Sequence, residues 1–283
     1  MTDQEPIKST MASIKTSNGG IVTPGKIITI TSGKGGVGKT TATANLGTAL
    51  VSLGRRVVCV DTDIGLRNLD LILGLEDHIV YNLVDVVEKR ATVSQALIRH
   101  KAASELYLLP SSQSRDKSAV DELQMMILCN ELKKSFDFVL IDSPAGIEHG
   151  FRLSLAPADQ VIIITTPEVS ALRDADRVVG ILGSKKQVPH SLVINRYRPN
   201  MVKRGRMLGP DEVIEILSGQ LIGIIPEDEE VINAAYEGKP VTFNSRSPAG
   251  REFVKTARRL LGEEIPFQAM NDSLSLIDRL LGR

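Results

Sequence analysis

One glycine-rich octapeptide combines the residue types needed to hold phosphate. It is Gly33-Lys34-Gly35-Gly36-Val37-Gly38-Lys39-Thr40, and it fits the pattern G-x-x-x-x-G-K-[ST] at every fixed position. Glycines let backbone N–H groups converge on an anion. Lys39 can neutralise β- and γ-phosphates, and the Thr40 hydroxyl, followed by Thr41, can hold Mg²⁺. We therefore predict a nucleoside triphosphate site; the alternative is a structural glycine turn without a ligand.

The residues around the octapeptide have the pattern of a strand, a loop and a helix. The apolar run 27–31 precedes the loop and reads as a buried strand, and a helical run over 40–51 follows it. This order is the structural context that a phosphate-binding loop requires. The start of the helix adds partial positive charge where the phosphates would lie.

Carboxylates at the ends of two other apolar runs complete the predicted site. Asp142 follows the run 138–141, and Asp61 follows 57–60, with Asp63 two residues later. Ligands of open α/β sheets bind beyond the carboxyl ends of the strands. We expect Asp61 and Asp142 near Mg²⁺. If the chain stays extended, Asp61 and Asp63 share a face, and one of them orients the attacking water. A single strand-end aspartate can instead be a helix cap or a turn residue.

The second lysine of the loop, Lys34, marks a family resemblance. In K-G-G-V-G-K-T-T it resembles the signature of the deviant Walker A ATPases, which include the ParA partition proteins, the nitrogenase iron protein and MinD. The resemblance covers residues 26 to about 268. Within that family, five stretches look like the MinD group: 61–71 (D-T-D-I-G-L-R-N-L-D-L), 111–117 (S-S-Q-S-R-D-K), 142–148 (D-S-P-A-G-I-E), 167–177 (P-E-V-S-A-L-R-D-A-D-R) and 223–228 (G-I-I-P-E-D).

The resemblance assigns roles to individual residues of the site. It implies that Lys34 reaches the phosphates of a partner subunit in an ATP-bound homodimer, where charge supplied in trans stabilises the transition state. It also implies that Asp63 positions the hydrolytic water and that Asp142 is linked to Mg²⁺. Asn195 matches a position that reads adenine, and Pro226 matches one that lines the base. The plainer alternatives are a solvated lysine and ordinary loop chemistry at Asn195.

A helix after Pro167 carries the predicted partner surface. By resemblance, Arg173, Asp174 and Asp176 face partner proteins near the dimer seam. The implied partners are a MinE-like activator and, where one exists, a MinC-like inhibitor of the division ring. The alternative is a solvated charged helix face with local ion pairs.

Composition favours a single α/β domain with an aliphatic core. The chain has 283 residues, of which 42% are apolar and only 4% aromatic, as suits a buried parallel sheet. Apolar strand patterns alternate with helical ones, such as 119–134 and 173–182, which predicts a doubly wound, mostly parallel P-loop NTPase sheet over 26–268. Cys59 and Cys129 read as core residues of a reducing compartment. The predicted strands are 27–31, 57–61, 106–109, 138–141, 161–165, 191–194 and 221–225.

The two ends of the chain differ from this domain. Residues 1–25 are polar and read as a flexible leader. Residues 269–283 predict an amphipathic helix that binds an anionic membrane surface, as the family's C-terminus does, or else a helix packed on its own core or in a coiled coil. Its charged side chains sum to zero, which weakens attraction to anionic lipid, but a dimer presents two such helices. The apolar face consists of Leu274, Leu276, Ile277, Leu280 and Leu281.

Three functions compete for this sequence. The first is a MinD-like ATPase using ATP and Mg²⁺ that regulates placement of the division septum. It would be a peripheral membrane protein on the cytoplasmic face of a bacterial inner membrane or the stromal side of a plastid inner envelope. Residues 146–151 and 202–205 look closest to cyanobacterial and plastid members. The second, a ParA-like DNA segregation ATPase, is disfavoured by a net charge of zero, so no nucleic acid is expected. The third, a P-loop kinase, leaves Lys34 unexplained.

Overall fold

The computed structural model describes residues 25–116, 118–185 and 188–267 of the chain. The polar leader predicted for residues 1–25 lies outside this part except for Gly25. The predicted amphipathic helix 269–283, with its five apolar side chains, also lies outside the described residues. Within them, no helix is long and apolar enough to cross a membrane.

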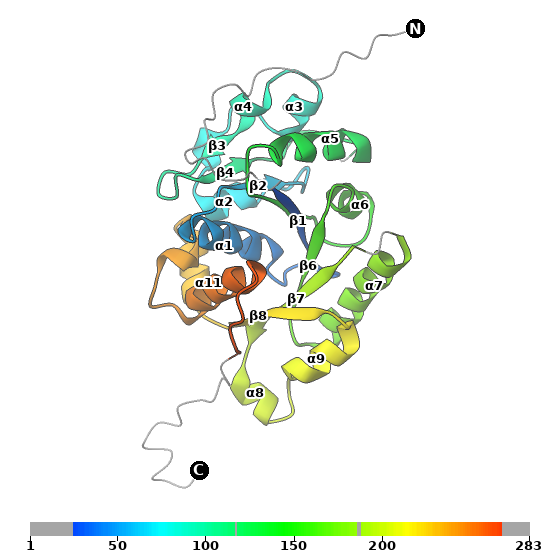
Figure 1. The fold of residues 1–283 in the computed structure, drawn as a ribbon, viewed down its shortest axis with the longest axis vertical. Helices are drawn as coiled ribbons and strands as arrows, with labels where there is room; N and C mark the ends of the chain where they lie inside the picture. Colours follow the sequence, from blue (N-terminus) through cyan, green and yellow to red (C-terminus); the bar gives the residue numbers. More distant parts are fainter. Residues whose placement is uncertain (1–24, 117, 186–187, 268–283) are drawn as a thin grey trace.

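One eight-stranded sheet forms the centre of the molecule (Figure 1). The strand order is β3-β4-β2-β5-β1-β6-β7-β8, and all neighbouring pairs are parallel except β3 with β4. The central position of β1 places the phosphate loop in the middle of the sheet's carboxyl edge. The strands are β1 (Lys26–Thr31), β2 (Val57–Asp61), β3 (Ile98–Arg99), β4 (Leu106–Leu109), β5 (Phe138–Asp142), β6 (Gln160–Thr165), β7 (His190–Tyr197) and β8 (Gln220–Pro226).

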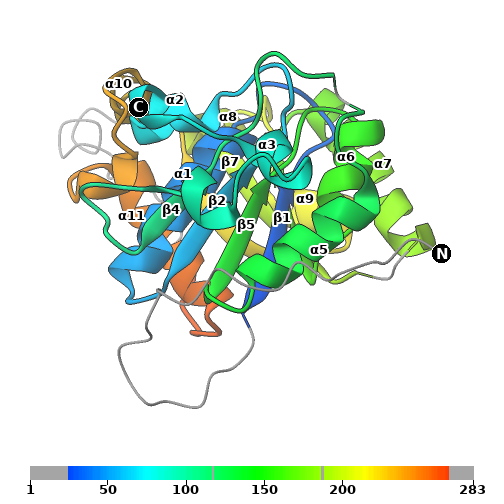
Figure 2. The same ribbon diagram turned by 90° about the horizontal axis from the view of Figure 1, so that it is seen from above.

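Helices cover both faces of the sheet (Figures 1 and 2). One face carries α1, α2 and α11, and the other carries α5, α6, α7 and α9. The helices are α1 (Lys39–Ser52), α2 (Leu69–Leu73), α3 (Leu83–Val87), α4 (Val93–Ala96), α5 (Glu122–Leu132), α6 (His149–Leu155), α7 (Val169–Lys185), α8 (Pro199–Lys203), α9 (Pro210–Leu217), α10 (Glu230–Tyr236) and α11 (Pro248–Leu260), with short 3₁₀ turns η1 (Glu76–His78) and η2 (Val241–Phe243).

Alternation along the strands explains the two layers. On β6, Ile162 and Ile164 pack toward α1 and α11, whereas Val161 and Ile163 pack toward α7. Successive side chains of a strand point to opposite faces, so a strand buried on both sides needs a continuous apolar run. The aliphatic composition supplies such runs, and both cysteines, Cys59 and Cys129, are buried core residues with free thiols.

The sequence prediction of a doubly wound, mostly parallel α/β sheet is confirmed. All seven predicted strands are present, with bounds that differ by at most three residues. The prediction missed β3, because two residues are too few to show alternation. It also placed the start of α5 too early: Asp121 caps that helix by accepting the N–H of Gln124 over 2.8 Å, so the helix begins at Glu122.

Candidate functional site

The glycine-rich loop lies between β1 and α1, as the sequence predicted. Gly36 and Gly38 adopt left-handed backbone angles, with φ of 76° and 98°, which glycine adopts without strain. Gly38 is the N-cap of α1 and offers no side chain to the first N–H groups of the helix. Those N–H groups therefore remain available to an anion such as phosphate. Gly35 and Gly36 are exposed, and the side chain of Val37 anchors the loop in the core.

Lys39 extends from α1 back toward the start of its own loop. Its side chain is buried, and its Nζ donates a hydrogen bond of 3.0 Å to the Oγ of Ser32. The Ser32 hydroxyl in turn donates to the carbonyl of Lys34 over 2.7 Å. Burial lowers the pKa of the Lys39 ammonium, and the carboxylates of Asp142 and Asp63 partly oppose this shift. Lys39 is thus held against the loop where phosphate oxygens would gather.

Asp142 ends β5 beside two threonine hydroxyls of α1. Thr43 Oγ1 donates to Asp142 Oδ1 over 2.9 Å, and the Thr40 hydroxyl also bonds to this carboxylate. Burial raises the pKa of Asp142, while the bonds from Thr40 and Thr43 and the charge of Lys39 oppose the shift. Mg²⁺ prefers oxygen ligands and usually binds through one or two protein groups together with nucleotide phosphates. A hydroxyl and a buried carboxylate at this position fit that requirement.

Asp61 lies next to Asp142, because the two residues are register partners of β2 and β5. The buried Asp61 carboxylate accepts the N–H of Asp63 over 2.8 Å and that of Leu69 over 3.4 Å. Burial, and then the charge of Asp142, raises the pKa of Asp61. Its oxygens therefore shape the loop after β2, and its predicted role toward Mg²⁺ stays a prediction.

The condition for Asp61 and Asp63 to share a face, that the chain stays extended between them, is not met. Asp63 begins a turn: its carbonyl accepts the N–H groups of Leu66 and Arg67. The turn forms because the Asp61 side chain captures the Asp63 N–H, a hydrogen bond that folds the backbone locally. Asp63 therefore lies on a loop and not on strand β2.

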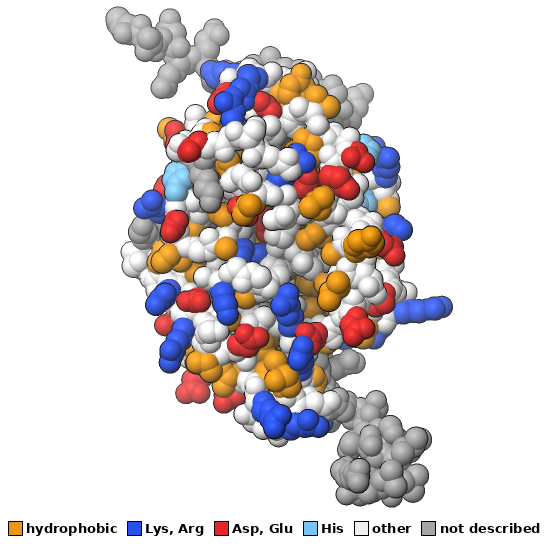
Figure 3. Space-filling model, turned by 180° about the vertical axis from the view of Figure 1, so that it is seen from behind, with side chains coloured by type: hydrophobic (Ala, Val, Ile, Leu, Met, Phe, Trp, Pro, Cys, Tyr) orange, Lys and Arg blue, Asp and Glu red, His pale blue; other side chains and the backbone are white. Residues whose placement is uncertain are grey.

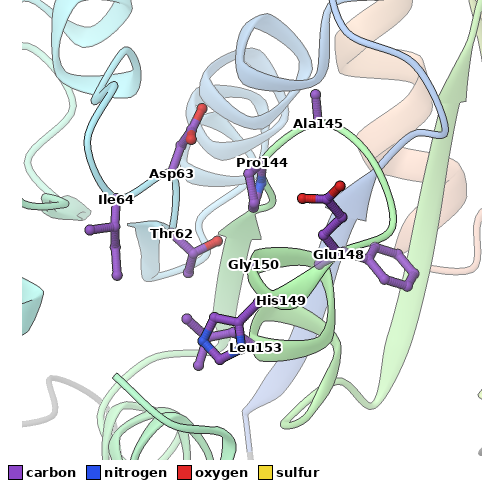
Figure 4. Close-up of a pocket in the computed structure, with 10 residues that line it drawn as sticks. Thr62, Asp63, Ile64, Pro144, Ala145, Glu148, His149, Gly150 and Leu153 are labelled. Carbon is purple, nitrogen blue, oxygen red and sulfur yellow. The ribbon is translucent and has the colours of Figure 1, made fainter. Parts of the chain in front are cut away.

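A small cavity of about 60 Å³ separates this loop from the loop after β5. Thr62 and Asp63 line one side, and Pro144, Glu148 and His149 line the other (Figure 4). The cavity has room for water but not for a nucleotide. Asp63 lines this cavity, and its predicted role of positioning the hydrolytic water stays a prediction.

The two residues predicted to contact a base lie near the carboxyl ends of neighbouring strands. Asn195 lies on β7, and its Nδ2 donates to the carbonyl of Val37 over 2.8 Å. Pro226 ends β8 and is the register partner of Tyr197. A Cβ at Gly38 would lie 2.4 Å from the Asn195 Nδ2, so only glycine fits beneath that amide. Asn195 is therefore brought against the phosphate loop, with Pro226 on the adjacent strand.

Helix α7 contacts the phosphate loop at two points. The exposed Lys34 donates from its Nζ to Ser170 Oγ over 3.1 Å, and a Cβ at Gly33 would lie 2.0 Å from the backbone carbonyl of Asp174. The predicted partner-facing residues Arg173 and Asp176 are exposed on this helix, and Asp174 pairs with Arg177. The helix that carries the predicted partner surface therefore contacts the nucleotide loop directly.

Three residues of this site were absent from the sequence prediction. Thr43 lies three residues after Thr40 and so shares its helix face, a signal that the sequence contained. Ser32 immediately precedes the loop. Ser170 is distant in sequence from Lys34, and no local pattern indicated that the two side chains would meet.

The fold and the site together define a P-loop nucleotide-binding domain. Residues 28–241 match the family model of the CobQ/CobB/MinD/ParA nucleotide-binding domain. The chain is 49% identical over 250 residues to the septum site-determining protein MinD of Bacillus subtilis. The aligned residues cover 88% of this chain and 93% of that protein. The chain belongs to the MinD family of P-loop ATPases.

Solved structures agree with this assignment. In the MinC:MinD cell division protein complex of Aquifex aeolicus, a chain 46% identical superposes with a TM-score of 0.81 and covers 86% of this chain and 98% of its own length. The septum site-determining MinD of Pyrococcus horikoshii, complexed with Mg-ADP, is 31% identical, has a TM-score of 0.75 and covers 85% of this chain and 99% of its own.

Proposed function

We propose that the protein is an ATP-driven switch that dimerises on ATP, binds an anionic membrane surface and directs placement of the division septum of a bacterial cell or a plastid. The observation that carries this proposal is the exposed Lys34, which lies on the nucleotide loop and contacts α7 through Ser170. An exposed lysine on this loop can release Ser170 and reach another subunit. Membership of the MinD family supports the same function.

The chemistry of hydrolysis follows from the groups around the loop. The N–H groups at the start of α1 and the Lys39 ammonium bind and orient the phosphates. Thr40 and Asp142 would hold Mg²⁺, which would supply neutralisation of phosphate charge when bound. Asp63 orients the water from its loop beside the small cavity. Lys34 of a second subunit then stabilises the developing charge, so that hydrolysis depends on dimerisation.

Exposed apolar side chains support a dimer across this edge. Leu66, Ile147 and Val169 are 63%, 42% and 58% exposed, and they follow β2, β5 and β6 respectively. Because the strands are parallel, all three lie near the carboxyl edge that also carries the phosphate loop. Burial of large apolar residues is favourable on association. A second copy facing this edge would cover them and bring the two Lys34 side chains to opposite sites.

Helix α7 is the proposed partner surface. Its exposed Arg173 and Asp176 flank Asp174, whose backbone touches Gly33 of the loop. A change in the loop on nucleotide binding is therefore transmitted to this face by direct contact. A MinC-like inhibitor and a MinE-like activator are the proposed occupants, and the Aquifex MinC:MinD complex supports the first.

The C-terminal segment is the proposed membrane anchor. Leu274, Leu276, Ile277, Leu280 and Leu281 would form its apolar face. One short helix without net charge binds weakly, and two helices on a dimer bind with avidity. The protein would then be peripheral on the cytoplasmic face of a bacterial inner membrane or the stromal side of a plastid inner envelope, and hydrolysis would release it.

Co-sedimentation with anionic lipid vesicles tests the proposal. The intact chain and a chain ending at Met270 are compared in ATP-Mg²⁺ and in ADP. The intact chain should sediment with vesicles only in ATP, and the shortened chain should stay in solution while still hydrolysing ATP. Sedimentation that ignores the nucleotide, or that survives removal of the tail, would contradict the membrane switch. ATP-dependent retention on DNA without vesicle binding would favour a partition function.

A further inference from the structure

A short basic segment begins in the last two residues of β7, the strand next to the edge strand β8. Residues 196–206 contain five cationic side chains and no acidic one, although the whole chain has a net charge of zero. All five cations are exposed: Arg196, Arg198, Lys203, Arg204 and Arg206. The segment is therefore locally basic, although the net charge of the chain gives no sign of it.

Apolar packing and a backbone hydrogen bond hold this segment against the rest of the fold. Val202 and Leu208 pack against the core cluster under α7 and α9, and Arg206 N–H bonds to the carbonyl of Met201 over 2.9 Å. Arg198 pairs with Glu227, and the acidic residues Asp211 and Glu212 begin α9. Lys203, Arg204 and Arg206 thus form the basic end of the segment, here called the α8 basic tip. Basic side chains gather over α8 at the lower end of the molecule (Figure 3).

The described chain leaves the fold at the same edge of the sheet. Phe267 lies against Arg259, with 3.9 Å between the guanidinium carbon and the ring centre. Arg259 also donates to the carbonyl of Ile222 on β8, 3.1 Å away. Since β8 is the edge strand next to β7, both the α8 basic tip and the last described residues lie on the β8 side of the sheet (Figure 1). The tip follows the carboxyl end of β7, and Arg259 lies beside the amino-terminal half of β8.

We propose that the α8 basic tip contacts anionic lipid headgroups and supplies the electrostatic attraction that the C-terminal segment lacks. Residues 268–283 carry Arg279 and Arg283 against Asp272 and Asp278, so their side chains give no net attraction to an anionic surface. Stable anchoring by a weak apolar insertion generally needs a second, basic signal. This inference rests on the proposed membrane function and names where its second signal lies.

The distribution of charge favours a lipid surface over nucleic acid. Nucleic-acid binding proteins have a broad basic footprint and a high isoelectric point. Here the cations occupy one short segment, Asp211 and Glu212 border it, and the isoelectric point of the chain is about 6.9. A compact group of three cations on the same β8 side of the sheet as the last described residues fits the headgroups of an anionic membrane.

The test compares two double variants of the intact chain in ATP-Mg²⁺. Arg204→Gln with Arg206→Gln removes two charges from the α8 basic tip. Arg99→Gln with Lys101→Gln removes two exposed charges at β3, the opposite edge strand. Each protein is titrated with vesicles of phosphatidylcholine alone and with vesicles in which part of it is replaced by phosphatidylglycerol. Retention on duplex DNA and ATP hydrolysis without vesicles are measured in parallel.

We expect the α8 variant to bind anionic vesicles on the order of thirtyfold more weakly than the intact chain, since each cation near an anionic surface contributes about fivefold. Its binding should lose most of its salt dependence, with hydrolysis in solution unchanged. The β3 variant should bind like the unaltered chain. Equal weakening of both variants, or none in the α8 variant, would overturn the inference. So would loss of DNA retention in the α8 variant with vesicle binding intact.

The unaltered chain separates this inference from the function on which it rests. If it fails to bind vesicles in ATP, the proposed membrane switch fails, and the basic tip fails with it. If it binds and the α8 variant binds equally well, the membrane switch stands and only the basic tip is refuted.

Discussion

The side-chain amide of Asn195 donates a hydrogen bond to the backbone carbonyl of Val37 across 2.8 Å, joining the end of β7 to the middle of the phosphate loop. The two residues are 158 positions apart in the chain. The same amide covers Gly38, where no side chain would fit. Asn195 therefore positions the loop in addition to its predicted place near the base.

Replacement of Asn195 by alanine should destabilise the protein even without nucleotide. The carbonyl of Val37 would lose a buried partner, at a cost of about 1–3 kcal/mol. Thermal unfolding with and without ATP, together with calorimetric titration of ATP, measures the effect. If Asn195 only read the base, the nucleotide-free melting temperature would be unchanged and only affinity would fall.

Replacement of Thr43 by valine should raise the Mg²⁺ concentration that hydrolysis requires, without unfolding the protein. Thr43 bonds to Asp142, and loss of a group that orients a metal ligand typically costs about tenfold to a hundredfold in metal affinity or activity. Titration of ATPase activity with Mg²⁺ should show a higher half-saturating concentration. Thr48→Val is the control on the same helix, because Thr48 bonds to Thr242 and not to the site. A Mg²⁺ titration of Thr43→Val that matches this control would refute the prediction.

The sequence predicted what depends on local pattern. Strands such as Val57–Asp61 are continuous apolar runs, and the phosphate loop is a contiguous motif, so both were read correctly. The sequence did not predict the helices of four or five residues, because so few residues carry too little periodicity. These helices are α2, α3, α4 and α8.

The parts of the site that were missed depend on tertiary contact. The pairing of Lys34 with Ser170 joins residues 136 positions apart. Asp228, which closes the stretch 223–228, accepts the Ser247 hydroxyl over 2.6 Å and the N–H of Ala249 over 3.1 Å. It therefore stabilises the start of α11 in the described structure, a role that its position in a family motif did not reveal.

Two glycines near α7 should respond to alanine in opposite directions. Gly33→Ala would drive a methyl group to 2.0 Å from the carbonyl of Asp174, so the loop or α7 must move, at a cost of about 1–3 kcal/mol. Gly180→Ala on α7 meets nothing within 4 Å and should stabilise the helix by about 0.5–1 kcal/mol. Urea unfolding of both variants measures the pair. A neutral Gly33→Ala would mean that the loop is not packed against α7.

Stability should fall in mild acid because of the buried His100. Its Nδ1 accepts the N–H of Ala103 over 3.0 Å, and its ring lies on Phe243 with 5.6 Å between ring centres. Burial lowers the pKa of His100 from 6.5, although a bond to the carbonyl of Leu73 partly opposes the shift. The unfolded chain therefore takes up the proton first. The contribution is fully present above the unfolded pKa and is lost as the pH falls below about 6.5, by up to about 1.4 kcal/mol for each pH unit until the folded pKa is reached.

Urea unfolding at about pH 7.5 and about pH 5.5 tests this linkage. The unaltered protein should lose more unfolding free energy between the two conditions than His100→Gln, by on the order of 1 kcal/mol, because glutamine does not titrate. His78→Gln is the matched control, since His78 is exposed, and it should follow the unaltered protein. Acid destabilisation of equal size in His100→Gln and the unaltered protein would show that His100 is not the titrating group. Asp61 and Asp142 would not account for such a loss, because burial raises the pKa of each and the folded protein therefore takes up their protons before the unfolded chain does.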